Sequence, residues 1–156
     1  MKRAKREETE TEVSDAEGYL RASLRAVERL QRRPKYTNPD WDSEEQGFHD
    51  CLGWTRVSLM TALDLRESER KEPEKERITA ERYLRASVQA IDAIMQKPEC
   101  ANAKLGTEEY GFRECLKRMR AIFEIVLELI EAEKDEKMKR RLEWKTGQVV
   151  KVNENP

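Results

Sequence analysis

The sequence predicts an all-α protein in which two duplicated helical hairpins form a four-helix bundle with a long last helix. Three observations support this fold class. Apolar residues recur at helical spacing, the chain repeats itself internally, and only six glycines and five prolines occur among 156 residues. Charged residues make up 40% of the chain and the mean hydropathy is −0.95, so each helix should have a heavily solvated outer face.

The helical spacing is clearest in the segment 107–132. Its first apolar stripe alternates steps of four and three residues, which is one face of an α-helix, and contains Phe112, Leu116, Met119, Phe123, Val126 and Ile130. A second stripe lies beside it and contains Cys115, Ile122, Ile125 and Leu129. An apolar arc of this width needs neighbours on more than one side.

The internal repeat has an offset of 64 residues and needs no gap. Residues 16–67 and 80–131 share 20 identities in 52 aligned positions, including the runs Tyr19–Ser23 and Tyr83–Ser87. A repeat of this strength indicates a duplicated unit, and two copies are too few for a solenoid. The predicted organisation is a charged arm at 1–12, repeat 1 at 13–72, repeat 2 at 73–146 and a flexible tail at 147–156.

The first two helices have clear start signals. Ser14 with Glu17, and Ser43 with Gln46, have the spacing of capping boxes. Pro34 should end the first helix, because the residue before a proline is pushed out of the α region. A polar loop is expected at 35–42, and the charged segment 66–77 should contain the boundary between the repeats.

The second pair follows the same plan. Pro73 suits the first turn of a helix at 74–96, and Pro98 should end it. Thr107 should cap the last helix, which extends as far as residue 145 with Gly147 as its C-cap. Past residue 132 only Met138, Leu142 and Trp144 are large and apolar, so that end should pack more loosely.

Two glycines stand at equivalent positions inside helices. Gly47 and Gly111 each lie one turn from a predicted helix start, where glycine costs about 1 kcal/mol relative to alanine. Their presence in both copies indicates close approach of another backbone, for which the first helix of the same repeat is the expected neighbour.

Differences between the copies indicate a candidate partner surface. Repeat 2 has an additional apolar face, which either receives repeat 1 or forms a subunit interface. Trp54 stands where repeat 2 has Arg118, so it is either an exposed contact or packs under the loop at Trp41. The predicted partner-binding residues are therefore Ile122, Ile125, Leu129, Ile130 and Trp54, and the expected partner is another protein or a second copy through the helix 107–132.

Catalytic, cofactor and metal sites are not predicted. His49 and Cys51 are two residues apart and would point to different sides of a helix, and no glycine-rich phosphate loop is present. The three cysteines are expected to be free thiols, with Cys51 and Cys115 buried and Cys100 in a loop. We therefore expect a protein that is not an enzyme.

The net charge and the length of the apolar segments indicate where in the cell the protein is expected. The net charge of −1 gives no overall attraction to nucleic acid or membranes, and no apolar run approaches the roughly 20 residues of a membrane span. Without a secretory signal the expected location is intracellular, and the Lys2, Arg3, Lys5 and Arg6 cluster suits either a solvated tail or a nuclear localisation signal.

A second basic cluster occurs near the end of the last predicted helix, next to Trp144. It contains Lys137, Lys139, Arg140 and Arg141, which could contact phosphates. Acidic residues are interspersed among them, and this favours a salt-bridged helix end. A nucleic-acid-associated helical protein using basic terminal segments is thus the alternative function.

The hexapeptide Gly111–Leu116, preceded by Tyr110, resembles the start of the Orange domain of the Hairy and Enhancer-of-split related repressors. The weaker copy at Gly47–Leu52 fits the same pattern. The resemblance covers roughly 25 residues per copy, and no basic helix-loop-helix precedes it. It implies a non-enzymatic protein–protein interaction or dimerisation module in transcriptional regulation. A degenerate helix-loop-helix that dimerises without binding DNA is an equal interpretation of the helix–loop–helix unit.

Overall fold

The computed structural model describes the backbone of residues 15–153 and the surroundings of the side chains of residues 15–146. The predicted arm at 1–12 lies outside these residues. The all-α prediction is confirmed for the part described, which contains six helices and no strand. They are α2 (Ala16–Gln31), α3 (Pro34–Thr37), α4 (Glu44–Lys71), α5 (Ala80–Gln96), α6 (Pro98–Ala101) and α7 (Glu108–Asn153).

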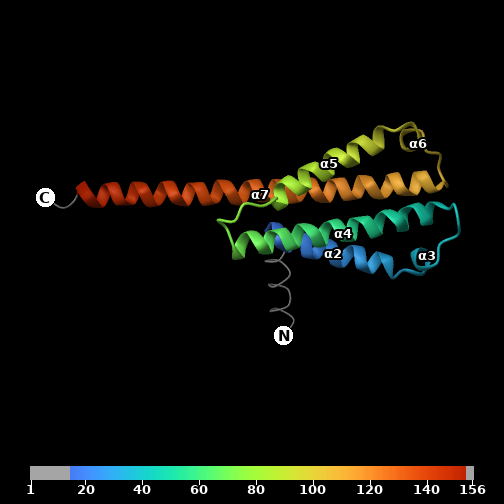
Figure 1. Cartoon of the computed structure of the whole chain (residues 1–156), viewed down its shortest axis with the longest axis horizontal. Coiled ribbons are helices and arrows are strands. Elements are labelled where there is room, and N and C mark those ends of the chain that lie inside the picture. The colour runs from blue at the N-terminus through green and yellow to red at the C-terminus, as the bar shows by residue number, and fades with distance from the viewer. Residues whose placement is uncertain (1–14, 154–156) are drawn as a thin grey trace, which may run out of the picture.

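The four long helices form a bundle with two central members. The helices α4 and α7 start at the same end and run in the same direction, while α2 and α5 run the opposite way along them (Figure 1). The most extensive contact is between α4 and α7, and each of the outer helices contacts both central ones. The apolar core is therefore shared by the two halves of the chain.

Side chains that accept hydrogen bonds define most of the helix starts. Ser43 accepts from the amide of Gln46, and Thr107 accepts from the amide of Tyr110, both as predicted. The N-cap of α2 is Asp15, which accepts from Gly18 at 2.6 Å, so the predicted cap at Ser14 is one residue too early. A carboxylate suits this position because it faces the unpaired amides of the first turn.

Four other predicted boundaries are wrong. The helix expected from residue 74 starts at Ala80, because the hydroxyl of Thr79 caps it there. The expected loops after Pro34 and Pro98 begin instead with the one-turn helices α3 and α6, each with proline in its first turn, where the missing amide costs nothing. Gly147 lies inside α7, because a single glycine weakens a helix by only about 1 kcal/mol.

The two predicted close-approach glycines lie where α4 crosses α7. A Cβ atom added at Gly47 would lie 1.9 Å from the carbonyl oxygen of Glu108, and one added at Gly111 would lie 1.9 Å from the carbonyl oxygen of Glu44. The expected close approach is therefore present, but the neighbour is the other central helix and not the first helix of the same repeat. Only glycine allows two backbones to come this close.

The starts of the outer helices are held by glutamates from the opposite half of the chain. The amide of Ala16 donates to Glu133 at 2.9 Å, and the amide of Ala80 donates to Glu69 at 2.7 Å. Arg66 also donates to Glu133, at 2.5 Å. Each half thus satisfies unpaired amides of the other, which ties α2 to α7 and α5 to α4.

The core follows the first apolar stripe closely. Leu116, Met119, Phe123 and Val126 of α7 have no exposed surface. All three cysteines are free and buried, so the expectation that Cys100 lies in an accessible loop is wrong. Its side chain is on α6 and only 7% exposed.

Candidate interaction surface

The second apolar stripe of α7 lies mostly against the rest of the chain. Cys115 is 2% exposed, while Ile122 and Leu129 are partly buried and packed on the core; Ile130, the partner-binding candidate from the first stripe, is 3% exposed. Ile125 is 39% exposed and is the most accessible of the four. The stripe is therefore packed on the core over most of its length, and a partner-binding role of these residues stays a prediction.

Trp54 is half-buried and stacks on Phe112, with ring centroids 6.5 Å apart and planes at 16°. Trp41 is 85% exposed, so its own ring does not cover Trp54, and packing of Trp54 under the loop at Trp41 stays a prediction. The predicted role of Trp54 as a contact for a partner is therefore confined to the part of its ring that this stack leaves open.

The last part of α7 leaves the bundle and projects from it as a single helix (Figure 1). At its base, Lys134 donates a hydrogen bond to Glu81 of α5. This contact lowers the pKa of the Glu81 carboxyl, with a further lowering from Arg85. Every residue from Lys134 to Thr146 is exposed. We call residues 134–153 the projecting segment.

Three large apolar side chains of the projecting segment are in contact with solvent. Met138 is 63% exposed, Leu142 59% and Trp144 64%. Met138 and Leu142 are four residues apart and so share one face of the helix. The sequence predicted only that this end of the helix packs loosely. Their exposure follows from the extent of the other helices, because α4 ends and α2 and α5 begin near the base of the segment (Figure 1).

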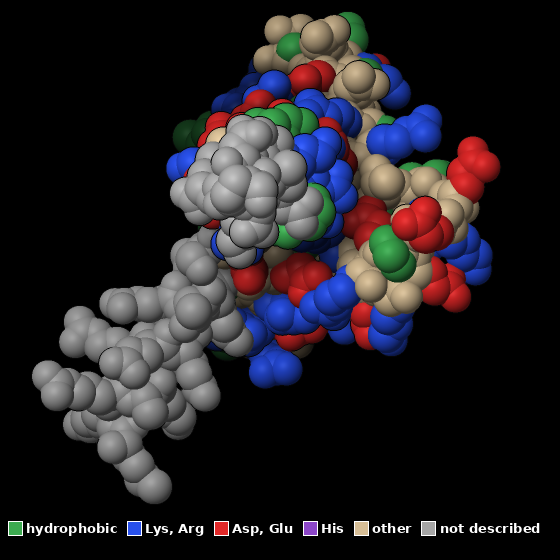
Figure 2. Space-filling view, turned by 90° about the vertical axis from the view of Figure 1, so that its left-hand side faces the viewer, with side chains coloured by type: hydrophobic (Ala, Val, Ile, Leu, Met, Phe, Trp, Pro, Cys, Tyr) green, Lys and Arg blue, Asp and Glu red, His purple; other side chains and the backbone are tan. Residues whose placement is uncertain are grey.

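The basic residues predicted for nucleic acid also lie on the projecting segment and are exposed. They are Lys137, Lys139, Arg140 and Arg141. Arg140 pairs with Glu136 at 3.5 Å, as expected for a salt-bridged helix end. In Figure 2, which looks onto this end of the molecule, Lys and Arg side chains lie next to hydrophobic ones around α7.

One side of this segment carries a row of basic residues. Lys134, Lys137, Arg141 and Lys145 follow one another at steps of three and four residues, which places them on one side of the helix. Met138 and Leu142 each follow one of these residues directly and border the same side. Glu136 and Glu143 fall on the opposite side together with Lys139, and Asp135, seven residues before Leu142, borders the apolar residues. The segment therefore presents a basic and apolar face.

None of the described helices is long and apolar enough to cross a membrane. Comparisons with protein-family models, with curated proteins and with solved structures found no match. The described residues form a helical bundle with a projecting helix, and the exposed surface of that helix is the candidate functional site.

Proposed function

We propose that this chain is a non-enzymatic interaction module that binds a protein partner through the projecting segment of α7. The observation that supports this proposal is the exposure of Met138, Leu142 and Trp144 on a helix that has left its own bundle. Tryptophan, methionine and arginine are the residue types enriched at protein interfaces, and tryptophan and arginine often dominate their binding energy.

The helix has a physical reason to bind. A single helix in water gains little from propensity, and most helical stability in proteins comes from packing of an amphipathic face. No other described helix runs beside the projecting segment (Figure 1), and its side chains Met138, Leu142 and Trp144 are exposed. A partner that covers Met138 and Leu142 would supply the missing packing and remove apolar surface from water.

Charge indicates the kind of partner. If two copies paired through Met138 and Leu142, Lys134 would oppose Lys139 in a parallel pair, and in an antiparallel pair the same basic side would oppose itself. Like charges at these positions disfavour self-association. The favoured partner is therefore a different protein that presents an amphipathic helix or groove with acidic residues beside its apolar stripe.

The biological setting proposed is transcriptional regulation in the nucleus. Its support is the resemblance of Gly111–Leu116 to the Orange domain and the basic cluster at Lys2–Arg6. An Orange-like role would agree with selection of a protein partner, which is the role proposed here for the projecting segment.

A second candidate function is association with nucleic acid, favoured by the exposed basic residues Lys137, Lys139, Arg140 and Arg141. Phosphates would be bound by these charges alone. Met138 and Leu142 would have no part in that binding, and this difference separates the two candidates.

The test uses the full chain and three fluorescent probes: a helical peptide with a leucine stripe flanked by glutamates, the same peptide with lysines for the glutamates, and a short DNA duplex. We expect anisotropy to show micromolar binding of the acidic peptide only. Leu142→Ser should weaken it about tenfold, the equivalent of about 1.4 kcal/mol. The matched control is Val57→Ser, which changes an exposed apolar residue of α4 far from the segment.

Charge reversal sharpens the test. Arg141→Glu should weaken the acidic peptide and strengthen the basic one, because the partner preference follows the sign of the flanking charge. Sedimentation of the wild-type chain should give a monomer. DNA binding that Leu142→Ser leaves unchanged would support the second candidate, and a dimer lost in Leu142→Ser would mean that a second copy is the partner.

A further inference from the structure

One of the differences between the two one-turn helices decides how the core is closed beside them. Tyr36 of α3 and Cys100 of α6 are equivalent in the repeat, 64 residues apart. The ring of Tyr36 is 8% exposed and stacks on Phe48, with centroids 5.0 Å apart and planes at 20°. The first half of the chain thus closes this position with an aromatic ring.

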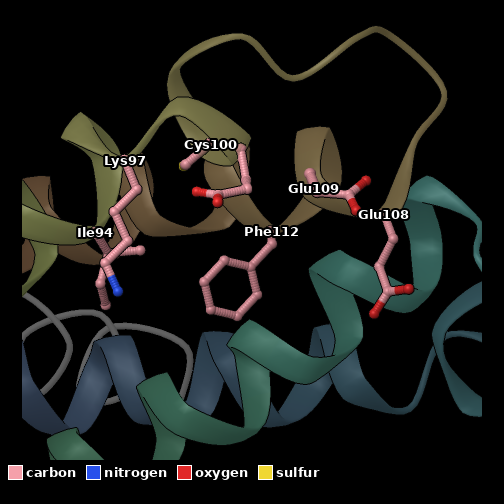
Figure 3. Close-up of a pocket in the computed structure, with 7 residues that line it drawn as sticks. Ile94, Lys97, Cys100, Glu108, Glu109 and Phe112 are labelled. Carbon is pink, nitrogen blue, oxygen red and sulfur yellow. The ribbon is translucent and has the colours of Figure 1, made fainter.

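The second half has a cavity at the equivalent position. Its volume is about 280 Å³, and Phe112, Cys100 and Ile94 line it, with Lys97, Glu108 and Glu109 among its polar residues. Phe112 is the counterpart of Phe48 in the repeat. Figure 3 shows the ring of Phe112 between the α5–α6 side chains and the two glutamates at the start of α7. The smaller cysteine side chain leaves open the space that the tyrosine ring fills in the first half.

Each of the two phenylalanines has a further neighbour from the opposite central helix. Arg118 lies over the ring of Phe48 at 5.2 Å, and its repeat counterpart Trp54 stacks on Phe112. Phe112 is therefore held in place by Trp54 whether or not the cavity is filled. A ring that is already positioned can bind a second ring at little ordering cost.

Size and chemistry indicate what fits. Apolar cavities of about 150 Å³ in proteins bind benzene, so the space over Phe112 can hold one substituted ring. Aromatic pairs gain about 0.5–1.5 kcal/mol beyond their buried area. The carboxylates of Glu108 and Glu109 can accept a hydrogen bond from a hydroxyl or amine at the outer end of such a ring. Burial and the neighbouring Asp50 and Asp42 raise the pKa of Glu108, as expected for a carboxyl held partly away from water.

We propose that the cavity over Phe112 is a binding site for a single aromatic ring that carries a hydrogen-bond donor, in the place that Tyr36 occupies over Phe48. The ring can belong to a small phenol-type ligand or to a tyrosine side chain. The site is at the opposite end of the bundle from the projecting segment (Figure 1), so it is independent of the function proposed above.

The test uses p-cresol, the free side chain of tyrosine, on the full chain with Trp41→Phe and Trp144→Phe. These changes leave Trp54, which stacks on Phe112, as the single tryptophan. We expect a saturable change in its fluorescence, with affinity at least about tenfold weaker for cyclohexanol, which has the same hydroxyl and no planar ring. Absence of saturation, or equal affinity for the two probes, would overturn the proposal.

Two matched variants each place the residue type of one repeat at the equivalent position of the other. Cys100→Tyr should fill the cavity and abolish binding, and Tyr36→Cys should open the equivalent space over Phe48 and raise the calorimetric stoichiometry from one p-cresol to two. Circular dichroism confirms that each variant is folded. Binding to folded Cys100→Tyr with unchanged affinity would overturn the assignment to this cavity.

A measurement on the unchanged chain does not depend on either variant. Bound p-cresol should slow alkylation of Cys100 in proportion to occupancy, while Cys51 and Cys115, buried between α4 and α7, serve as internal controls. Unchanged alkylation at saturating p-cresol would contradict the proposal. A blocked tyrosine tripeptide distinguishes the sources: protection by p-cresol alone indicates a small ligand, and protection by both indicates that a partner's tyrosine can enter.

Discussion

The crossing of α4 and α7 gives the sharpest prediction, because it depends on a contact between two backbones. In Gly47→Ala the new methyl group would lie 1.9 Å from the carbonyl oxygen of Glu108, whereas ordinary contact begins near 3.4 Å. A side chain could rotate away from such a clash, but the main chain of α7 cannot. The two central helices must therefore separate locally by about 1.5 Å.

The expected cost follows from two opposing terms. Alanine is better than glycine in a helix interior by about 1 kcal/mol. Overpacking a core costs about 1–3 kcal/mol and at times more, and a separation above about 1 Å forfeits much of the dispersion energy of the side chains nearby. A Cβ atom is fixed to its own main chain and meets the main chain of the other helix, so neither can rotate away. We therefore place the overpacking cost at or above the upper end of this range. The net loss in the free energy of unfolding should be at least about 2 kcal/mol.

Gly53 supplies the matched control. It lies in the same helix, and a Cβ atom added there would meet nothing within 4 Å. Gly53→Ala should therefore gain up to about 1 kcal/mol from helix propensity alone. Urea unfolding followed by circular dichroism should place Gly47→Ala and Gly53→Ala on opposite sides of the wild-type chain. A Gly47→Ala variant as stable as the wild type would refute the crossing.

The equivalent residue tests the geometry a second time. Gly111→Ala should cost about as much as Gly47→Ala, because its added Cβ would lie 1.9 Å from the carbonyl oxygen of Glu44. The double variant should cost less than the sum of the two, since one separation of the helices relieves both clashes. Full additivity would indicate that the two sites are independent.

Three further predictions concern packing and charge. Phe48→Ala should cost about 3–5 kcal/mol in urea unfolding, and Phe112→Ala less, because that ring already borders a cavity; the reverse order would contradict the assignment of the cavity. Ile125→Asp should keep its helicity by circular dichroism, since the side chain is 39% exposed, and unfolding would instead place it in the core. Because the pKa of Glu81 is lowered in the folded state, its ion pair with Lys134 stabilises the fold above the unfolded carboxyl pKa and is lost as pH falls through the folded value. Glu81→Gln should therefore be less stable than the wild type at neutral pH and equal to it in acid, and a difference that persists in acid would exclude the ion pair as its cause.

The sequence determined the helical class and the composition of the core by itself. The alternating steps of four and three residues place Leu116, Met119 and Phe123 on one face of α7, and these side chains are buried. Caps at Ser43 and Thr107 were also predictable, because a hydroxyl that accepts from the amide three residues on is a local interaction. Local spacing and local hydrogen bonds need no knowledge of the rest of the fold.

The tertiary structure decided which surfaces meet. The repeat indicated that Gly47 and Gly111 touch another backbone, but only the parallel arrangement of α4 and α7 shows that each touches the other's helix. The second stripe of α7 could have been core or interface, and the choice depends on where the other half of the chain lies. A periodic pattern shows that a face is apolar, and it leaves open what covers that face.

The candidate surfaces show the same limit. Met138 and Leu142 are exposed because none of α2, α4 and α5 extends beside them, a matter of relative helix length and not of their own residue types. The cavity over Phe112 exists because Cys100 stands where the other half places the ring of Tyr36. In the sequence this difference is one mismatch between the two repeats. Only the packing of each one-turn helix against its phenylalanine shows that the position is filled in one half and open in the other.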